Sequence, residues 1–232
     1  GNNLYAESLV AVDLKTGKKR WHFQLVHHPI WDYDAVGAPL IVDATIDGKP
    51  RKLVAQASKQ GWLYVFDRLT GEPIWPMPER PVPQSTVPGE KTSPTQPFPS
   101  KPPAYSRNFL APEDVIDFTP ALRQQALENL KKYRWEQAPF VPAVIPDGKI
   151  FGSINVANTM GGVNWPGSGF DPETSTFYTQ AYNSQVSATA ISPEYFKLLD
   201  PAAQAKHRIP IWESEHFGKE ESFGPRGPSP LT

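Results

Sequence analysis

The residues best suited to chemistry lie in one loop, between Trp21 and the next apolar segment. Residues 27–39 read His-His-Pro-Ile-Trp-Asp-Tyr-Asp-Ala-Val-Gly-Ala-Pro, so that the carboxylates of Asp32 and Asp34 stand two positions apart among aromatic rings. Carboxylates beside aromatic rings are a setting in which pKa values shift, and loops on a rigid sheet are where acid–base sites are built. On composition alone, a turn with solvated carboxylates and a stacked tryptophan explains the same residues.

Two further segments combine polar groups with turn residues. Lys59 lies within residues 56–62, Gln-Ala-Ser-Lys-Gln-Gly-Trp, which read as a hairpin turn. Residues 160–169 contain two adjacent glycines followed by Asn164 and Trp165. The glycines let the backbone approach a flat molecule, while the asparagine and tryptophan offer a hydrogen-bonding edge beside an aromatic face. The plainer alternatives are a solvent-facing lysine and an irregular entry into a strand.

A repeat in the sequence indicates which elements position these groups. Residues 9–21 and 63–75 each consist of an apolar strand, Asp-x-x-Thr-Gly, three residues and a tryptophan, and they recur 54 residues apart. A degraded third copy spans 170–178, with Ser175 in place of glycine. Asp and Thr bind turn N–H groups, Gly supplies a positive φ, and a repeated Trp suits packing between radial sheets. The pattern predicts one blade of a β-propeller per unit, and two hairpins of a β-sandwich are the alternative.

The remaining segments predict an all-β chain with one insertion. Ten prolines between Pro76 and Pro103 favour an extended, ordered loop without strand ladders, for which a disordered linker is the alternative. Thr119 and Pro120 then predict the start of an amphipathic helix that runs to Tyr133. Strands are expected at about 8–13, 19–25, 39–43, 52–57, 62–67, 72–75, 149–154, 167–171 and 176–182, and a short helix at 193–199.

The overall composition excludes several classes of protein. The 232 residues include 23 basic and 24 acidic ones, a formal net charge of -1, which argues against a nucleic-acid partner or an anionic membrane surface. Cysteine is absent, so the chain has no disulfide framework and no thiolate metal site.

Three runs of sequence together resemble one family. These are HHPIWDYDAVGAPLIVD at 27–43, the stretch from ASKQGWLYVFDRLTGEPIW at 57–75 through the proline-rich segment to Tyr105, and GGVNWPGSGFDPETSTFY at 161–178. In this order they resemble the pyrroloquinoline-quinone (PQQ)-dependent dehydrogenases, in the quinoprotein glucose dehydrogenase branch rather than the methanol dehydrogenases. The resemblance implies an eight-bladed propeller. Residues 1–232 would form about three blades of four-stranded antiparallel sheet, a fragment of a single propeller domain, with 76–148 as a proline-rich loop and helix insertion.

The resemblance also assigns roles to residues. Asp32 matches the general base that takes the substrate hydroxyl proton, and Lys59 matches the basic residue that hydrogen-bonds the quinone oxygens. Asn164 and Trp165 match a segment near the cofactor. A bound Ca²⁺ is expected to polarise the quinone carbonyl, with Asp32 as a candidate ligand. Asp34 resembles the extra carboxylate of lanthanide-using relatives, although a structural turn residue is the favoured explanation, and a lanthanide is the less favoured metal.

The function that follows is a periplasmic dehydrogenase that oxidises a sugar or alcohol and passes electrons to ubiquinone or cytochrome c. The family's other metal ligands and the tryptophan that stacks on the cofactor are expected upstream of Gly1, so the chain alone should be inactive. Membrane attachment, if any, would come from parts outside this chain. The rival hypothesis is a non-catalytic propeller scaffold of the outer-membrane assembly type, which should lack the Trp-Asp-Tyr loop and the Lys59 turn.

Overall fold

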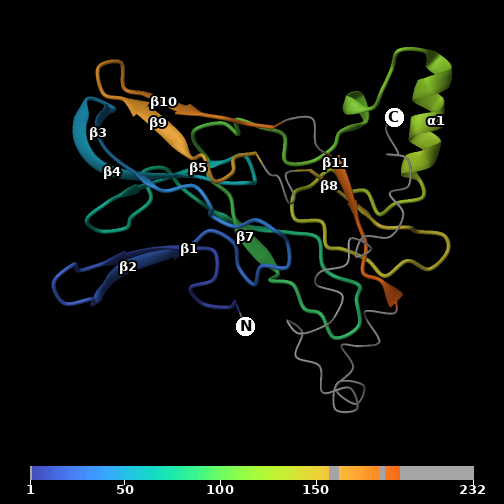
Figure 1. Cartoon of the computed structure of the whole chain (residues 1–232), viewed down its shortest axis with the longest axis horizontal. Coiled ribbons are helices and arrows are strands. Elements are labelled where there is room, and N and C mark those ends of the chain that lie inside the picture. Colours follow the sequence, from blue (N-terminus) through green and yellow to red (C-terminus); the bar gives the residue numbers. More distant parts are fainter. Residues whose placement is uncertain (1, 157–161, 183–185, 194–232) are drawn as a thin grey trace.

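The computed structural model describes residues 2–156, 162–182 and 186–193, and these form short antiparallel strands with little helix (Figure 1). The paired strands form the sheets β1–β2, β3–β4–β5, β6–β7, β9–β10 and β8–β11. Most of the expected strands are present, whereas the helix expected at 193–199 lies almost entirely outside the described residues. The strands are β1 (Ser8–Val12), β2 (Lys19–Gln24), β3 (Leu40–Ile46), β4 (Lys49–Ala57), β5 (Leu63–Asp67), β6 (Glu79–Pro81), β7 (Thr95–Pro97), β8 (Ser153–Val156), β9 (Ser168–Asp171), β10 (Thr176–Thr179) and β11 (Val186–Thr189).

The repeated Asp-x-x-Thr-Gly turns fold alike. In each turn the aspartate Oδ1 accepts hydrogen bonds from the backbone N–H groups two and three residues later, at 3.1 and 2.9 Å for Asp13 and at 2.9 and 3.0 Å for Asp67. Gly17 and Gly71 have φ values of +67° and +77°, and Ser175 takes the same left-handed conformation at +55° in the third copy. The three copies are therefore one structural unit, and the third tolerates a serine where glycine is favoured.

The tryptophans of the first two units pack on the following sheet. Trp21 lies against Gly71 in the next Asp-x-x-Thr-Gly turn, and its indole N–H donates to the Arg68 carbonyl at 3.1 Å. Trp75 packs in the same cluster as Phe170 of β9. The prediction that these rings lie between neighbouring sheets is confirmed.

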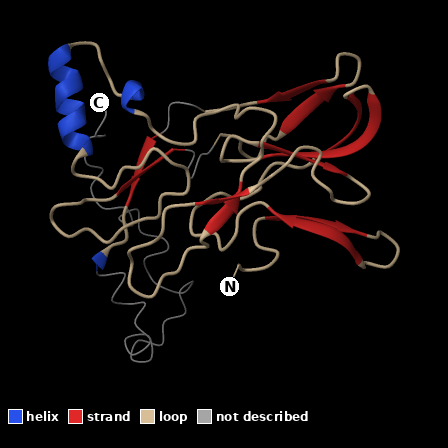
Figure 2. Ribbon diagram, turned by 180° about the vertical axis from the view of Figure 1, so that it is seen from behind, coloured by secondary structure: helices blue, strands red, loops and turns tan. Residues whose placement is uncertain are grey.

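The β3–β4–β5 sheet is covered on both faces. Val54 and Phe66 belong to a cluster shared with β1 and β2, whereas the alternating positions Leu53 and Val65 belong to a second cluster shared with β9 and β10. Figures 1 and 2 show the β1–β2, β3–β4–β5 and β9–β10 sheets one above another when seen from opposite sides. Facing sheets of this kind are the arrangement of propeller blades. The described residues contain no four-stranded sheet and no closed ring, so the number of blades stays a prediction.

The proline-rich segment is ordered, but the prediction that it forms no strand ladder is wrong. β6 pairs with β7 in antiparallel register, with Arg80 opposite Gln96. The ladder survives the prolines because their carbonyls still accept: Val82 N–H donates to Pro94 O at 3.2 Å, and Phe98 N–H donates to Pro78 O at 3.0 Å. Phe98 then packs against the cluster under β5, which docks the segment onto the body.

The insertion contains a short 3₁₀ helix, Pro112–Asp114, and the helix α1, Pro120–Leu130. The predicted start of α1 is confirmed, because the Thr119 side chain accepts a hydrogen bond from the N–H of Leu122 at 3.2 Å. The helix ends before the expected Tyr133, and Ala126 and Leu130 are its buried residues. No helix in the described part of the chain is long and apolar enough to cross a membrane.

Candidate active site

Two of the predicted segments meet at one buried lysine. The Lys59 ammonium lies 3.4 Å from Asp32 Oδ2 and 3.3 Å from Asp34 Oδ2. The lysine comes from the turn between β4 and β5, and the carboxylates come from the loop between β2 and β3. Only 4% of the Lys59 side chain is exposed, against 43% and 56% for the Asp32 and Asp34 side chains. A buried cation therefore holds two solvent-accessible carboxylates together.

The third predicted segment adjoins both of the others. Gly162 N–H donates to the Lys59 carbonyl at 2.6 Å. A Cβ placed on Gly37, in the aspartate loop, would lie 3.4 Å from Gly167 Cα and 3.7 Å from the Asn164 carbonyl oxygen. The Trp165 side chain is 78% exposed, so its ring is accessible to a bound molecule. The structure thus brings the three sequence motifs to one place.

The residues on either side of Asp32 are anchored. Trp31 donates its indole N–H to the Val141 carbonyl at 2.9 Å, and Tyr33 is buried. Their rings stack at 5.9 Å with an interplanar angle of 17°, and both meet Phe140 edge-on. The flanking aromatics fix the backbone at Asp32 and leave its carboxylate facing outward.

The surroundings raise the pKa of Asp32. Loss of hydration is the largest cause, followed by a hydrogen bond with Asp34, while the charge of Lys59 acts in the opposite direction. A carboxylate with a raised pKa is a stronger proton acceptor. Its geometry and electrostatics therefore suit a general base.

A further carboxylate, Glu7, was missed by the sequence reasoning. It directly precedes β1, and burial together with the charges of Asp34 and Asp32 raises its pKa to about 8, although Lys59 lowers it. Among the described residues, its Oε2 atom is buried without a hydrogen-bond partner. No local pattern marks Glu7, because the charges that act on it come from residues 25 or more positions away in sequence.

His27 ties the loop to the proline-rich segment. His27 Nε2 lies 2.9 Å from Glu79 Oε1, and its Nδ1 lies 2.8 Å from Gln24 Oε1. The amide of the fully buried Gln96 accepts from His27 N–H at 2.7 Å and donates to His27 O at 2.8 Å. These contacts hold the start of the aspartate loop.

The oxygen ligands available at the site meet the needs of a cation such as Ca²⁺ only in part. Ca²⁺ prefers carboxylate and amide oxygens and takes about six to eight of them. Asp32 and Asp34 carry oxygens of this kind, but no group of three His, Cys, Asp or Glu side chains that could hold a metal ion occurs in residues 2–156, 162–182 and 186–193. Next to Lys59, the buried amide of Gln60 has no partner among the described residues, so a polar group bound there would satisfy it.

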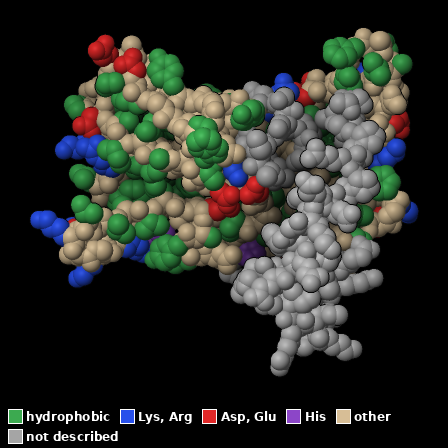
Figure 3. Space-filling view, in the orientation of Figure 1, with side chains coloured by type: hydrophobic (Ala, Val, Ile, Leu, Met, Phe, Trp, Pro, Cys, Tyr) green, Lys and Arg blue, Asp and Glu red, His purple; other side chains and the backbone are tan. Residues whose placement is uncertain are grey.

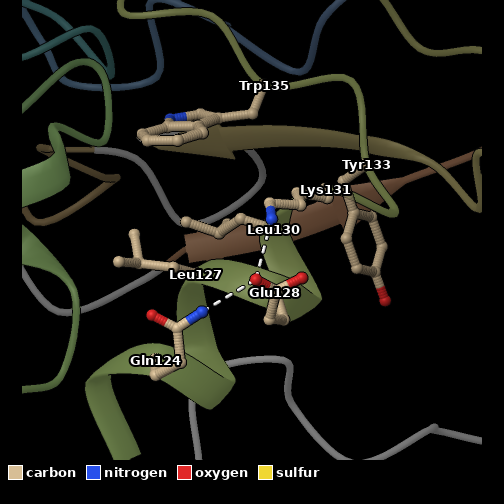
Figure 4. A pocket seen from close by; sticks show the side chains of 7 residues that line it. All are labelled: Gln124, Leu127, Glu128, Leu130, Lys131, Tyr133 and Trp135. Atoms are coloured by element: carbon tan, nitrogen blue, oxygen red, sulfur yellow. Dashed lines mark hydrogen bonds and ion pairs between the residues drawn. The ribbon is translucent and has the colours of Figure 1, made fainter. Parts of the chain in front are cut away.

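A pocket of about 490 Å³ lies elsewhere, over α1. Figure 4 shows Glu128 linked to Gln124 and Lys131 along its rim, with Trp135 and Tyr133 nearby. None of its lining residues belongs to the three motifs. The pocket belongs to the insertion and not to the site.

Comparisons with known proteins identify the family. The family model described as glucose/ethanol/alcohol dehydrogenase, beta-propeller domain (PQQ), matches residues 1–223. The chain is 32% identical over 169 residues to the quinate/shikimate dehydrogenase (quinone) of Acinetobacter baylyi, covering 72% of this chain and 20% of that protein. It is 35% identical over 170 residues to the quinoprotein glucose dehydrogenase of Gluconobacter oxydans, covering 73% and 20%.

A solved structure, the quinohemoprotein alcohol dehydrogenase of Comamonas testosteroni, matches 79% of this chain and 20% of its own, with 27% identity and a TM-score of 0.45. The chain belongs to the family of PQQ-dependent dehydrogenase propeller domains, as its match to the family model establishes. It is similar to the quinoprotein glucose dehydrogenases within that family, and it spans about a fifth of the length of the curated relatives named above.

Proposed function

We propose that this chain forms part of a quinoprotein dehydrogenase that oxidises a sugar or alcohol hydroxyl, with Asp32 as the general base. The observation that carries the proposal is the contact of Lys59 with Asp32 and Asp34, directly beside the Gly162–Gly167 segment. Family membership supports PQQ as the cofactor. The domain is a single propeller, with residues 76–148 as an insertion within it.

Each residue has a distinct task in the proposed mechanism. Asp32 accepts the hydroxyl proton of the substrate on a carboxylate oxygen whose pKa is raised by burial. Lys59 holds the carboxylate in place and carries a positive charge to the site where an oxyanion develops. Asn164 and Trp165 provide a polar edge and an accessible ring for binding. PQQ, when bound, supplies the acceptor for the hydride that leaves the carbinol carbon, and a divalent cation supplies Lewis acidity.

The proposed metal is Ca²⁺, bound in part by Asp32 and Asp34. Two accessible carboxylates on one loop offer the oxygen ligands that Ca²⁺ uses, and a lanthanide is the less favoured alternative. The remaining ligands would come from residues outside the described site, from the cofactor or from water. A periplasmic location and ubiquinone or cytochrome c as electron acceptor belong to the same proposal and rest on the family resemblance alone.

The proposal is tested with the full-length polypeptide, reconstituted with PQQ and Ca²⁺. Dye-linked oxidation of glucose, short alcohols and quinate is measured for the wild type and for Asp32→Asn. We expect turnover in the wild type and loss of activity by about 100-fold or more in the variant, with unchanged thermal unfolding. Asp43→Asn is the matched control, because Asp43 is an exposed carboxylate on β3 that pairs with Arg68.

Three results would contradict the proposal. Absence of turnover with every hydroxyl substrate would favour the scaffold hypothesis, in which the propeller binds partners without catalysis. Full activity in Asp32→Asn would remove Asp32 from the reaction. A loss of the same size in Asp43→Asn would show that any change of charge on the surface has this effect.

A further inference from the structure

One tyrosine, Tyr105, holds the turn that carries Lys59 through hydrogen bonds to its backbone. The Tyr105 hydroxyl accepts a hydrogen bond from Ser58 N–H at 2.9 Å and donates to the Ser58 carbonyl at 2.6 Å. The backbone N–H of the same tyrosine donates to the Gly61 carbonyl at 2.9 Å. Tyr105 therefore binds both ends of the four-residue turn, 58–61, from the end of the proline-rich segment.

Gly162 and Ser106 fix the rest of the turn. Gly162 N–H donates to the Lys59 carbonyl at 2.6 Å. Ser106 fills the space between the two glycines, because a Cβ on either Gly61 or Gly162 would collide with the Ser106 hydroxyl. The peptide groups on both sides of Lys59 are thus held by residues far away in sequence.

This constraint matters because the lysine is buried. A lysine side chain is flexible and strongly hydrated, so holding its ammonium in a fixed, buried position requires a fixed backbone. The ammonium must reach two carboxylates at 3.3 and 3.4 Å from a side chain that is almost fully covered. A small shift of the turn would move the ammonium out of contact with at least one of them.

We propose that Tyr105 is a positioning residue that sets the place of the Lys59 ammonium through the turn 58–61. The end of the proline-rich segment then supports the active site structurally. This inference rests on the proposed function for its catalytic consequence, but its structural part stands on the turn alone. The hydrogen bonds of Tyr105 join it to the backbone of the turn, so it acts on the site through Lys59.

The first test measures the lysine directly, in the full-length polypeptide without cofactor or metal. Amine acetylation at Lys59 is followed by mass spectrometry in the wild type and in Tyr105→Phe. We expect slow labelling in the wild type and labelling about tenfold faster in the variant, because loss of the hydroxyl releases the turn and exposes the ammonium. Tyr178→Phe is the control, since the Tyr178 side chain on β10 is exposed. A second variant with 3-fluorotyrosine at position 105 keeps the hydroxyl and should label like the wild type.

The second test measures catalysis in the reconstituted enzyme. We expect Tyr105→Phe to lower kcat about tenfold with little change in KM, because the substrate contacts remain while the ammonium is displaced. In a Lys59→Ala background the same substitution should have no further effect, since the two residues act through one group. A merely structural tyrosine would instead give additive losses.

The outcomes separate this inference from the proposed function. Equal Lys59 labelling in Tyr105→Phe and the wild type, or equal acceleration in Tyr178→Phe, overturns the inference. Additive losses in the double variant overturn it as well. If the wild type shows no dehydrogenase activity at all, the proposed function fails, and the labelling experiment alone decides whether Tyr105 positions Lys59.

Discussion

The indole ring of Trp21 packs on the main chain of Gly71, a residue of the next sheet. The Trp21 N–H donates to the Arg68 carbonyl at 3.1 Å, and a Cβ on Gly71 would lie 2.5 Å from the ring. The repeat supplies both partners, because each of the first two units carries a tryptophan after its turn and a glycine within it. One sequence pattern thus encodes the turn and the packing of neighbouring sheets.

Substitution of this glycine should cost more than its backbone conformation alone. We expect Gly71→Ala to lower the free energy of unfolding by about 3 kcal/mol, from a positive φ and from displacement of the ring. Gly17→Ala is the matched control, because Gly17 also has a positive φ but nothing lies within 4 Å of an added Cβ. That variant should lose only about 1 kcal/mol, from strain. Chemical unfolding of both variants in the full-length polypeptide measures the difference, and equal losses would contradict the packing role of Trp21.

The buried carboxyl of Glu7 should make stability depend on pH. Its pKa is raised from 4.5 to about 8 in the folded protein, chiefly by burial. The folded state therefore keeps a proton that the unfolded state releases, and this stabilising contribution, complete below about pH 4.5, is lost as the pH rises to about 8. We expect Glu7→Gln to remove this dependence and to raise the free energy of unfolding at pH 8 by about 2 kcal/mol. Unfolding measured between pH 5 and 8 checks it, and parallel pH curves for the variant and the wild type would refute it.

Local patterns in the sequence predicted much of this site, whereas its contacts between residues far apart in sequence were not predicted. The repeated turns, the start of α1 and the three motifs around Lys59 follow from residues that are close in sequence. Glu7 carries no such signal, and no local pattern links Tyr105 to the Lys59 turn, because the contacts of both residues come from groups that are far away in sequence. The β6–β7 ladder was missed for another reason. Proline lacks a backbone N–H donor but its carbonyl still accepts hydrogen bonds, so the high proline content did not exclude strand pairing.

Trp165, which is exposed, and Trp31, which is anchored by a hydrogen bond, should respond differently to substitution. Trp165 is largely exposed, so we expect Trp165→Ala to leave thermal unfolding unchanged and to weaken PQQ binding about tenfold, through loss of ring contact. Trp31→Phe keeps the aromatic stack but leaves the buried Val141 carbonyl without its donor, which should cost about 1–2 kcal/mol of stability. Fluorescence titration with PQQ and thermal unfolding measure the two effects. Unchanged PQQ affinity in Trp165→Ala would remove that residue from the cofactor site.

The two interpretations of Asp34, metal ligand and turn residue, predict different affinities for Ca²⁺. Asp34 is accessible and shares the Lys59 ammonium with Asp32, so its carboxylate is available to a cation that approaches from solvent. If it is a ligand, Asp34→Asn should weaken Ca²⁺ binding by about tenfold or more in the full-length polypeptide with PQQ present, because an anionic oxygen is replaced by a neutral one. Isothermal titration with Ca²⁺ and with La³⁺ measures this, with Asp43→Asn as the control. A lanthanide site should lose more affinity than a calcium site, since a trivalent ion gains more from each carboxylate. Unchanged affinity for both ions would leave Asp34 as a turn residue, whose carboxylate serves only to pair with Lys59.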